Sequence, residues 1–380
     1  MVETTVPRER TARDKLRAAQ KDLFPIQGID YLELYVGNAL QAAHYYRALW
    51  GYDITAYQGP ETGHRDHVSY VLEQGRIRLV LTAPLQATGA IAEHVTRHGD
   101  GVKDIALRVP NVDHAYQVAL SRGARGVMEP QESSDDQGTV KRAAIATYGD
   151  TIHSLIERDY HGPFLPGYRK REIKGHGVGL RVVDHIVGNV ELGRMDEWVA
   201  FYANVMGFEQ LVHFSDEQIA TEYSALMSKV VQDGTGKIKF PINEPAQGKK
   251  KKSQIDEYLD YYNGPGAQHI AVATGDILDT VARLEANGVD FLHTPHTYYQ
   301  DLPERIGQIK EDLEKLEAHS ILADRDDDGY LLQIFSRPVE DRPTLFYELI
   351  ERHGCRGFGE GNFKALFEAI EREQAERGNL

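Results

Sequence analysis

Two histidines occupy matching places in two similar segments of the chain, and together they could bind a metal ion. His185 lies early in VDHIVGNV (183–190) and His269 early in AQHIAVAT (267–274), and a helix-like segment follows each. If the two segments form equivalent strands of two packed modules, both imidazoles face the axis between the modules. Either histidine alone, among 16 in the chain, would more often be an ordinary core or surface residue. The prediction therefore depends on the pair.

A third ligand is expected from PTLFYELIER (343–352), which places Glu348 in an aromatic and aliphatic run. In a strand, Phe346, Glu348 and Ile350 share one face. An ionised carboxylate there is costly unless a cation or hydrogen bonds compensate it, although an edge strand with its glutamate in solvent is the alternative. Two histidines and one carboxylate with open positions form the facial triad of non-haem Fe(II) oxygenases. We therefore predict one Fe(II) per chain.

The elements that carry these residues belong to an internal repeat. HYYRALWGYDITAY (44–57) resembles AFYANVMGFEQLVHF (200–214), and GDGVKDIAL (99–107) resembles GPGAQHIAV (264–272). The first pair consists of a helix that ends at a glycine and is followed by a strand. Each half then contains two modules of strand, helix and further strands. The repeat predicts an α+β chain made of two similar halves.

The first half is expected to lack a metal site. Tyr31 and Asp104 occupy the places that match the two histidines. We align residues 149–158 with residues 328–337 as a turn leading into a buried strand, which leaves residues 161–169 for the third ligand. That segment contains no acid, so the first half is predicted to serve packing and assembly.

The repeat also suggests domain boundaries. Residues 1–22 are predicted to be a flexible leader, because they are rich in charge and lack the apolar core of a signal peptide. We expect a metal-free domain over 23–168, a charged and glycine-rich linker over 169–181, and the metal-binding domain over 182–380.

Composition and charge exclude several classes of partner. The formal net charge of −15 disfavours nucleic acid and anionic lipid, and the lysine run at 248–252 has no aromatic neighbours. No apolar run approaches the ~18 residues that a membrane helix needs. A single cysteine, Cys355, cannot form a disulfide within the chain. These features predict a cytoplasmic protein without nucleic-acid or membrane partners.

A glycine-rich segment near the C-terminus is predicted to be a hinge. GCRGFGEGNF (354–363) contains Gly357, Gly359 and Gly361 and precedes an amphipathic helix, an arrangement suited to a lid that excludes water. Upstream, DRDDDG (324–329) has the early spacing of a calcium loop, but Phe335 stands where the twelfth ligand should be. We predict a hairpin turn there.

The chain after the leader resembles the 4-hydroxyphenylpyruvate dioxygenase family of the vicinal-oxygen-chelate superfamily. The matching stretches are VDHIVGNV, FPINEP, GAQHIAV, LLQIFSRP, TLFYELIERHG and RGFGEGNFKALFEAIEREQ. The resemblance implies two domains, each an open β-barrel of paired βαβββ modules, with iron in the C-terminal barrel only and a C-terminal lid helix.

The resemblance also implies the site residues and the reaction. It makes His185, His269 and Glu348 the Fe(II) ligands. It assigns substrate contacts to a set of amide, hydroxyl and aromatic side chains: Ser228, Asn243, Gln254, Gln268, Gln333, Phe335, Phe358 and Phe363. The implied enzyme converts 4-hydroxyphenylpyruvate and O2 to homogentisate and CO2 in tyrosine and phenylalanine catabolism. Triketone-type inhibitors that chelate the iron, and a homo-oligomer (dimer or tetramer), are implied as well.

Three alternatives remain open at this point. Hydroxymandelate synthase, a sibling in the family, uses the same substrate and triad but tends to carry a smaller aliphatic residue where this chain has Phe363. Extradiol dioxygenases and glyoxalase-like isomerases share only the bare triad. The chain could also sequester an aromatic ligand without turnover, which an oxygen-uptake measurement would reveal.

Overall fold

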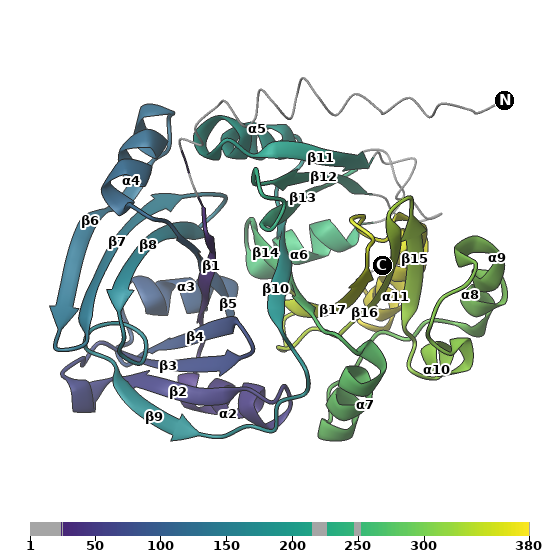
Figure 1. Cartoon of the computed structure of the whole chain (residues 1–380), viewed down its shortest axis with the longest axis horizontal. Coiled ribbons are helices and arrows are strands. Elements are labelled where there is room, and N and C mark those ends of the chain that lie inside the picture. The colour runs from purple at the N-terminus through teal and green to yellow at the C-terminus, as the bar shows by residue number, and fades with distance from the viewer. Residues whose placement is uncertain (1–23, 25, 215–225, 247–251, 380) are drawn as a thin grey trace, which may run out of the picture.

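The computed structural model describes residues 24, 26–214, 226–246 and 252–379. The leader predicted over 1–22 and most of the lysine run lie outside these residues. Two curled mixed sheets lie side by side with helices packed around them (Figure 1). Among the described residues, no helix is both long and apolar enough to span a membrane.

The first sheet has the order β6-β7-β8-β5-β1-β4-β3-β2-β9. Its half of the chain contains these elements: β1 (Gly28–Tyr35), α2 (Ala39–Ala48), β2 (Asp53–Gln58), the short turn η1 (Pro60–Thr62), β3 (His67–Gln74), β4 (Ile77–Pro84), α3 (Ala90–His98), β5 (Gly101–Arg108), α4 (Val112–Ser121), β6 (Gly126–Asp135), β7 (Gly138–Ala146), β8 (Ile152–Tyr160) and β9 (Arg169–Ile173). Strand β9, which lies in the expected linker, pairs with β2 and so extends this sheet.

The second sheet has the order β11-β12-β13-β10-β14-β17-β16-β15. Its elements are β10 (Val182–Asn189), α5 (Met195–Met206), β11 (Glu209–Phe214), β12 (Leu226–Gln232), β13 (Lys239–Pro245), α6 (Gln254–Tyr262), β14 (Gly266–Ala273), α7 (Ile277–Asn287), α8 (His296–Gln300), α9 (Leu302–Ile306), α10 (Leu313–Ala318), β15 (Leu322–Asp326), β16 (Gly329–Phe335), β17 (Phe346–His353), the short turn η2 (Glu360–Asn362) and α11 (Phe363–Glu376). Each half therefore consists of two βαβββ modules, which confirms the predicted α+β fold class.

The two strand orders correct one part of the predicted repeat. Strand β8 pairs in parallel with β5 as β17 pairs with β14, so 152–160 corresponds to 346–353. The alignment of 149–158 with 328–337 is therefore wrong, and so is the assignment of 161–169 to the third ligand position. Asp104 pairs with Ile152 as His269 pairs with Phe346, which makes Ser154 the counterpart of Glu348.

The two halves share one hydrophobic core, and close backbone approaches join them. At Gly188, an added Cβ would lie 2.6 Å from the Tyr148 ring; at Gly101, it would lie 2.7 Å from the Tyr262 ring. Each glycine therefore lets an aromatic ring of the other half lie flat against its strand. This packing fixes β10, which carries His185, and the end of α6 against the first half. Strand β14, which carries His269, contacts β5 of the first half.

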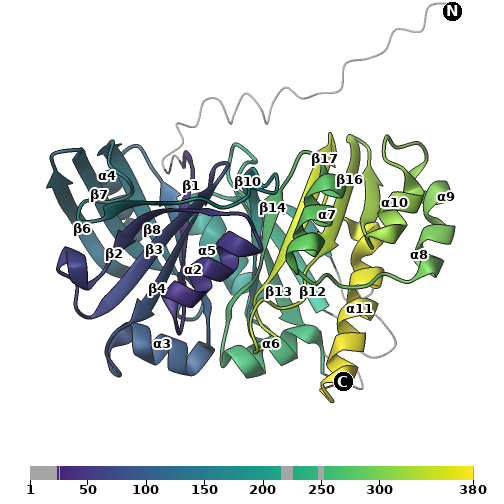
Figure 2. The ribbon, with the colours of Figure 1, turned by 90° about the horizontal axis from the view of Figure 1, so that it is seen from below.

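The C-terminal helix α11 covers part of the second sheet. Figure 2 shows α11 (yellow) running down this half to the C-terminus. Phe367 is buried with Phe214 and Ile255, and Arg377 forms an ion pair of 2.7 Å with Glu257 on α6. These contacts hold the predicted lid helix against the second half.

Candidate metal centre and substrate pocket

The three predicted metal ligands converge on one point inside the second sheet. His185, His269 and Glu348 lie on the adjacent strands β10, β14 and β17, and all three are buried. Glu348 Oε2 lies 3.0 Å from His185 Nε2 and 3.4 Å from His269 Nε2. One ligand atom of each residue falls within 4.8 Å of the others. This spacing is close enough for one ion to reach all three.

The residue before each histidine fixes the orientation of its ring. His185 donates from Nδ1 to Asp184 Oδ1 at 2.8 Å, and His269 donates from Nδ1 to Gln268 Oε1 at 3.0 Å. A histidine that donates from Nδ1 presents the lone pair of Nε2 when it is neutral. Two lone pairs and a carboxylate then face one another in a buried space, which is the environment of a cation. The residues present therefore fit a divalent metal ion.

The electrostatics of the trio agree with this fit. Burial opposes ionisation of Glu348, but the two imidazoles outweigh it and hold the pKa of the carboxyl at about 2. Burial works against a charge on His185 as well, yet the Glu348 and Asp184 carboxylates raise its pKa. Burial lowers the pKa of His269. The carboxylate therefore stays ionised in the interior, where a metal ion would compensate its charge.

Asp184 is held by two cations behind His185. Arg352 donates to both Asp184 oxygens, at 2.8 and 2.9 Å, and Lys239 Nζ lies 3.9 Å away. This residue was not among the predicted site residues. The repeat could have pointed to Asp184, because an aspartate stands at the same place in both halves: Asp30 before Tyr31 and Asp184 before His185.

Replacing Asp184 with asparagine should weaken Fe(II) binding by about 10- to 100-fold, the usual effect of removing the partner of a metal-bound histidine. The Nδ1–H of His185 would lose its charged acceptor, and the ring would be less firmly oriented. An anaerobic competition titration with a chelator measures the change. Asp30→Asn, the same substitution in the other half, is the matched control and should leave the iron affinity unchanged.

The equivalent place in the first half carries different chemistry. Tyr31 donates to Asp104 Oδ2 at 3.2 Å, and the Ser154 backbone N–H donates to Asp104 Oδ1 at 2.9 Å. Burial raises the pKa of Asp104 to about 7. A phenol, a carboxyl and a serine thus stand where the second half has two imidazoles and a carboxylate, and they satisfy one another.

A pocket opens directly on the trio of His185, His269 and Glu348. It is lined by every residue predicted to contact substrate: Ser228, Asn243, Gln254, Gln268, Gln333, Phe335, Phe358 and Phe363. Sequence reasoning missed the other lining residues: Val187, Phe214, Val230, Pro241, Phe346, Leu366 and Phe367. Phe346 alone had a signal, because it shares a strand face with Glu348.

The pocket has aromatic walls next to the predicted metal ligands. The Phe346 ring stacks on His269 with centroids 4.8 Å apart, and the Phe358 ring meets His185 edge to face at 5.1 Å. Phe363 packs against Phe214 at 4.8 Å. Apolar walls with a few amides and one hydroxyl suit a flat ring that carries polar groups.

The segment between β17 and α11 is tied to the β15–β16 hairpin. Asp326 Oδ1 accepts from the backbone of Asp328 and Gly329 and forms the predicted turn, while Asp326 Oδ2 accepts from Arg356 and Gly357. The aspartates of 324–329 therefore anchor the glycine segment. Of the three predicted hinge glycines, Gly359 alone has a left-handed backbone, with φ of 76°.

Replacing Gly359 with alanine should lower turnover, because an added Cβ would lie 2.2 Å from Gln333 Oε1 and would disfavour the left-handed backbone. Gln333 and Phe358 would then shift inside the pocket. Steady-state kinetics with the keto acid should give a higher KM and a lower kcat. Gly193→Ala is the control, since Gly193 has φ of 77° but no neighbour within 4 Å; equal losses in both variants would contradict the steric argument.

Comparison with known proteins identifies the family to which the chain is similar. Residues 24–163 match the family model described as "Hydroxyphenylpyruvate dioxygenase, HPPD, N-terminal", and residues 182–334 match the "Glyoxalase/Bleomycin resistance protein/Dioxygenase superfamily". The chain is 47% identical to the 4-hydroxyphenylpyruvate dioxygenase of Dictyostelium discoideum, over 93% of this chain and 100% of that protein. It is 46% identical to that of Xenopus tropicalis, over 92% of each.

A solved structure gives the same picture of the fold. A triple mutant of 4-hydroxymandelate synthase from Streptomyces coelicolor superposes with a TM-score of 0.84 at 34% identity, over 92% of this chain and 99% of that one. The similarity to the dioxygenases is higher and spans nearly the whole chain. The chain therefore belongs to the 4-hydroxyphenylpyruvate dioxygenase family.

Proposed function

We propose that this protein is an Fe(II)-dependent dioxygenase that converts 4-hydroxyphenylpyruvate and O2 to homogentisate and CO2. The observation that carries the proposal is the convergence of His185, His269 and Glu348 within 4.8 Å on the wall of a pocket lined by amides and phenylalanines. Identity of 47% to a 4-hydroxyphenylpyruvate dioxygenase over nearly the whole chain supports it.

His185 and His269, through Nε2, and Glu348, through its carboxylate, would hold one Fe(II). When bound, the iron supplies the oxidative chemistry by which O2 reacts with an α-keto acid, and it leaves positions open for the keto acid and O2. Gln268 and Asp184 keep the two imidazoles oriented, and Glu348 offsets part of the charge of the cation.

The pocket side chains have separate tasks in binding the substrate. Ser228 and Asn243 face each other on neighbouring strands β12 and β13, and Gln254 and Gln268 add two amides at the pocket wall. Gln333 is 1% exposed, and its Oε1 accepts no hydrogen bond from the described residues. An amide oxygen of this kind would accept from the phenol of the substrate. Phe335 and Phe363 would hold the ring between apolar faces.

The closed lid would exclude water from the pocket. Phe358 lies on the glycine segment, while Phe363 and Phe367 lie on α11, and all three line the pocket. Water exclusion strengthens the polar contacts inside the pocket and prevents side reactions. Opening at Gly357, Gly359 and Gly361 would admit substrate, and triketone-type inhibitors would chelate the iron in the same space.

The competing product is 4-hydroxymandelate, because a solved structure of this fold belongs to a 4-hydroxymandelate synthase. Phe363 favours homogentisate, since a full ring at this position leaves less room for the side chain of the substrate to turn. Product chromatography after aerobic turnover should give homogentisate as the main product, and 4-hydroxymandelate as the main product would reverse the proposal. No oxygen uptake with substrate and Fe(II) would instead indicate a binding protein.

We also propose a cytoplasmic location and a homo-oligomer, in which the half without the iron site offers the surface for self-association. The boundaries at 23–168 and 182–380 remain part of this proposal. Light scattering after size exclusion should give a dimer or tetramer, and a monomer would contradict this part alone.

A further inference from the structure

A second group of potential metal ligands lies far from the pocket, in the first half. His94 and His98 are one turn apart on α3, so they share a face of the helix. Their ring centroids lie 4.6 Å apart. Asp150, in the turn before β8, completes a group whose ligand atoms fall within 4.8 Å of one another.

His98 is oriented as a metal-bound histidine usually is. Its Nδ1–H donates to the backbone carbonyl of Tyr262, and its Nε2 lies 3.0 Å from Asp150 Oδ2. The ring also stacks on the Tyr262 side chain with centroids 4.3 Å apart. A backbone carbonyl on one ring nitrogen leaves the other nitrogen directed at the ligand position.

His94 is buried without a partner. It is 4% exposed, and neither ring nitrogen has a hydrogen-bond partner among the described residues. A neutral imidazole carries a lone pair on one ring nitrogen, and no donor among the described residues approaches that nitrogen in His94. Unpaired polar groups are rare in protein interiors because burial removes their hydrogen bonds to water without replacing them. Coordination to a cation would compensate that loss.

We propose that His94, His98 and Asp150 bind one divalent transition-metal ion, for which zinc is the best match. Zinc accepts two imidazoles, one carboxylate and a water in a tetrahedral arrangement. Arg97 now lies 3.7 Å from Asp150 Oδ2, and the ion would replace it as the partner of the carboxylate. Lys103 donates to the backbone oxygen of Asp150 and would remain in place. The Asp150 side chain is 42% exposed and gives the ion a path from solvent.

The position of this group indicates what the ion would do. All three ligands belong to the first half. The carbonyl that accepts from His98 belongs to Tyr262, the last residue of α6 in the second half. Figure 2 shows α3 and α6 side by side. The ion would therefore stiffen the contact between the two halves, and α6 carries Gln254 of the substrate pocket at its other end.

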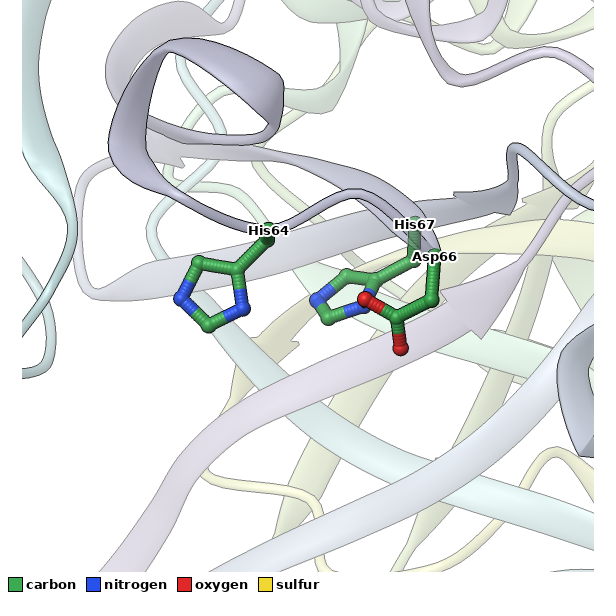
Figure 3. A group of neighbouring side chains, drawn as sticks. All are labelled: His64, Asp66 and His67. Atoms are coloured by element: carbon green, nitrogen blue, oxygen red, sulfur yellow. The ribbon is translucent and has the colours of Figure 1, made fainter.

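A surface group provides the contrast and the control. His64, Asp66 and His67 lie together where a loop enters β3 (Figure 3). The Asp66 side chain is 72% exposed, and His67 already pairs with Asp66 and with Gln58. None of the three residues is fully buried, and His67 keeps one ring nitrogen bonded to Gln58, so we propose no metal site here.

The test is a count of zinc bound per metal-free chain after desalting, measured by elemental mass spectrometry. The parent should bind two zinc ions, one at each histidine site. Glu348→Ala, His94→Phe and Asp150→Asn should each bind one, and Glu348→Ala combined with His94→Phe should bind none. His64→Ala should bind as many as the parent.

Two further measurements show whether a lower zinc count reflects loss of the proposed site or loss of the fold. Zinc should raise the thermal midpoint of Glu348→Ala but not of the double variant, and His94→Phe with Fe(II) should retain oxygen uptake. Equal zinc counts in the parent, His94→Phe and Asp150→Asn would overturn the proposal, as would a Glu348→Ala protein that binds no zinc.

Discussion

Replacing Glu348 with alanine is expected to abolish Fe(II) binding and turnover together. The carboxylate is the only anionic ligand of the proposed trio, and both imidazoles face its Oε2. Loss of a ligand that supplies several kcal/mol to a metal site should lower turnover by at least about 10³-fold. Bound iron is measured after anaerobic loading and desalting, and turnover by oxygen uptake.

Ser154→Ala is the matched control for this prediction. Ser154 occupies the same position of β8 that Glu348 occupies in β17, and its substitution should leave iron content and turnover near those of the parent. A Glu348→Ala protein that keeps full iron occupancy would remove Glu348 from the ligand set. His185→Ala should behave as Glu348→Ala does.

Replacing Arg158 with alanine should produce the largest loss of stability among the substitutions considered. Arg158 Nε lies 2.8 Å from Asp30 Oδ2, and both side chains are almost completely buried. Without the guanidinium, the one ion-pair partner that the described residues offer the Asp30 carboxylate is Arg78, at 3.7 Å. Breaking a buried ion pair in this way costs roughly 3–5 kcal/mol. Urea unfolding followed by circular dichroism should report a free energy of unfolding lower by that amount.

A double variant separates the cost of the unpaired charge from the loss of packing. Asp30→Asn combined with Arg158→Met removes both charges and keeps most of the side-chain volume, so it should regain much of the lost stability. Iron content per folded chain should stay unchanged in both proteins, because Asp30 belongs to the half that lacks the proposed iron site. A stability loss that persists in the double variant would indicate that packing dominates.

This buried pair is repeated in the two halves of the chain. Asp30–Arg158 in the first half and Asp184–Arg352 in the second are the same interaction, and both arginines end the sequence LIER, at 155–158 and 349–352. The residues of the proposed metal trio differ between the halves, whereas this buried pair is the same in both. The pair therefore stabilises the fold of each sheet. In the second half, its aspartate, Asp184, also orients His185.

The site was predictable because its residue types are unusual where they stand. A carboxylate inside an apolar strand such as β17 needs a charged partner, and the repeat supplied the two histidines. The family resemblance then gave the pocket residues, which line the pocket as predicted. Phe214 and Phe367 escaped notice because an aromatic residue in a strand or helix has the same pattern whether it packs in a core or faces a ligand.

The error in the repeat has a physical cause as well. Residues 149–158 and 328–337 both read as a turn followed by a buried strand, and hydrophobic pattern alone does not reveal which neighbour a strand pairs with. Parallel pairing of β8 with β5 and of β17 with β14 depends on contacts distant in sequence. The shared LIER segment was the local signal that could have corrected the alignment.

The most direct test of the central claim is an anaerobic titration of the metal-free chain with Fe(II) and 4-hydroxyphenylpyruvate, followed by oxygen and product identification. A visible charge-transfer band should appear in the parent, saturate at one iron and one keto acid per competent site, and give way to homogentisate after oxygen is admitted. The band should be absent in Glu348→Ala. No band in the parent, or the same band in Glu348→Ala, would contradict the proposed site.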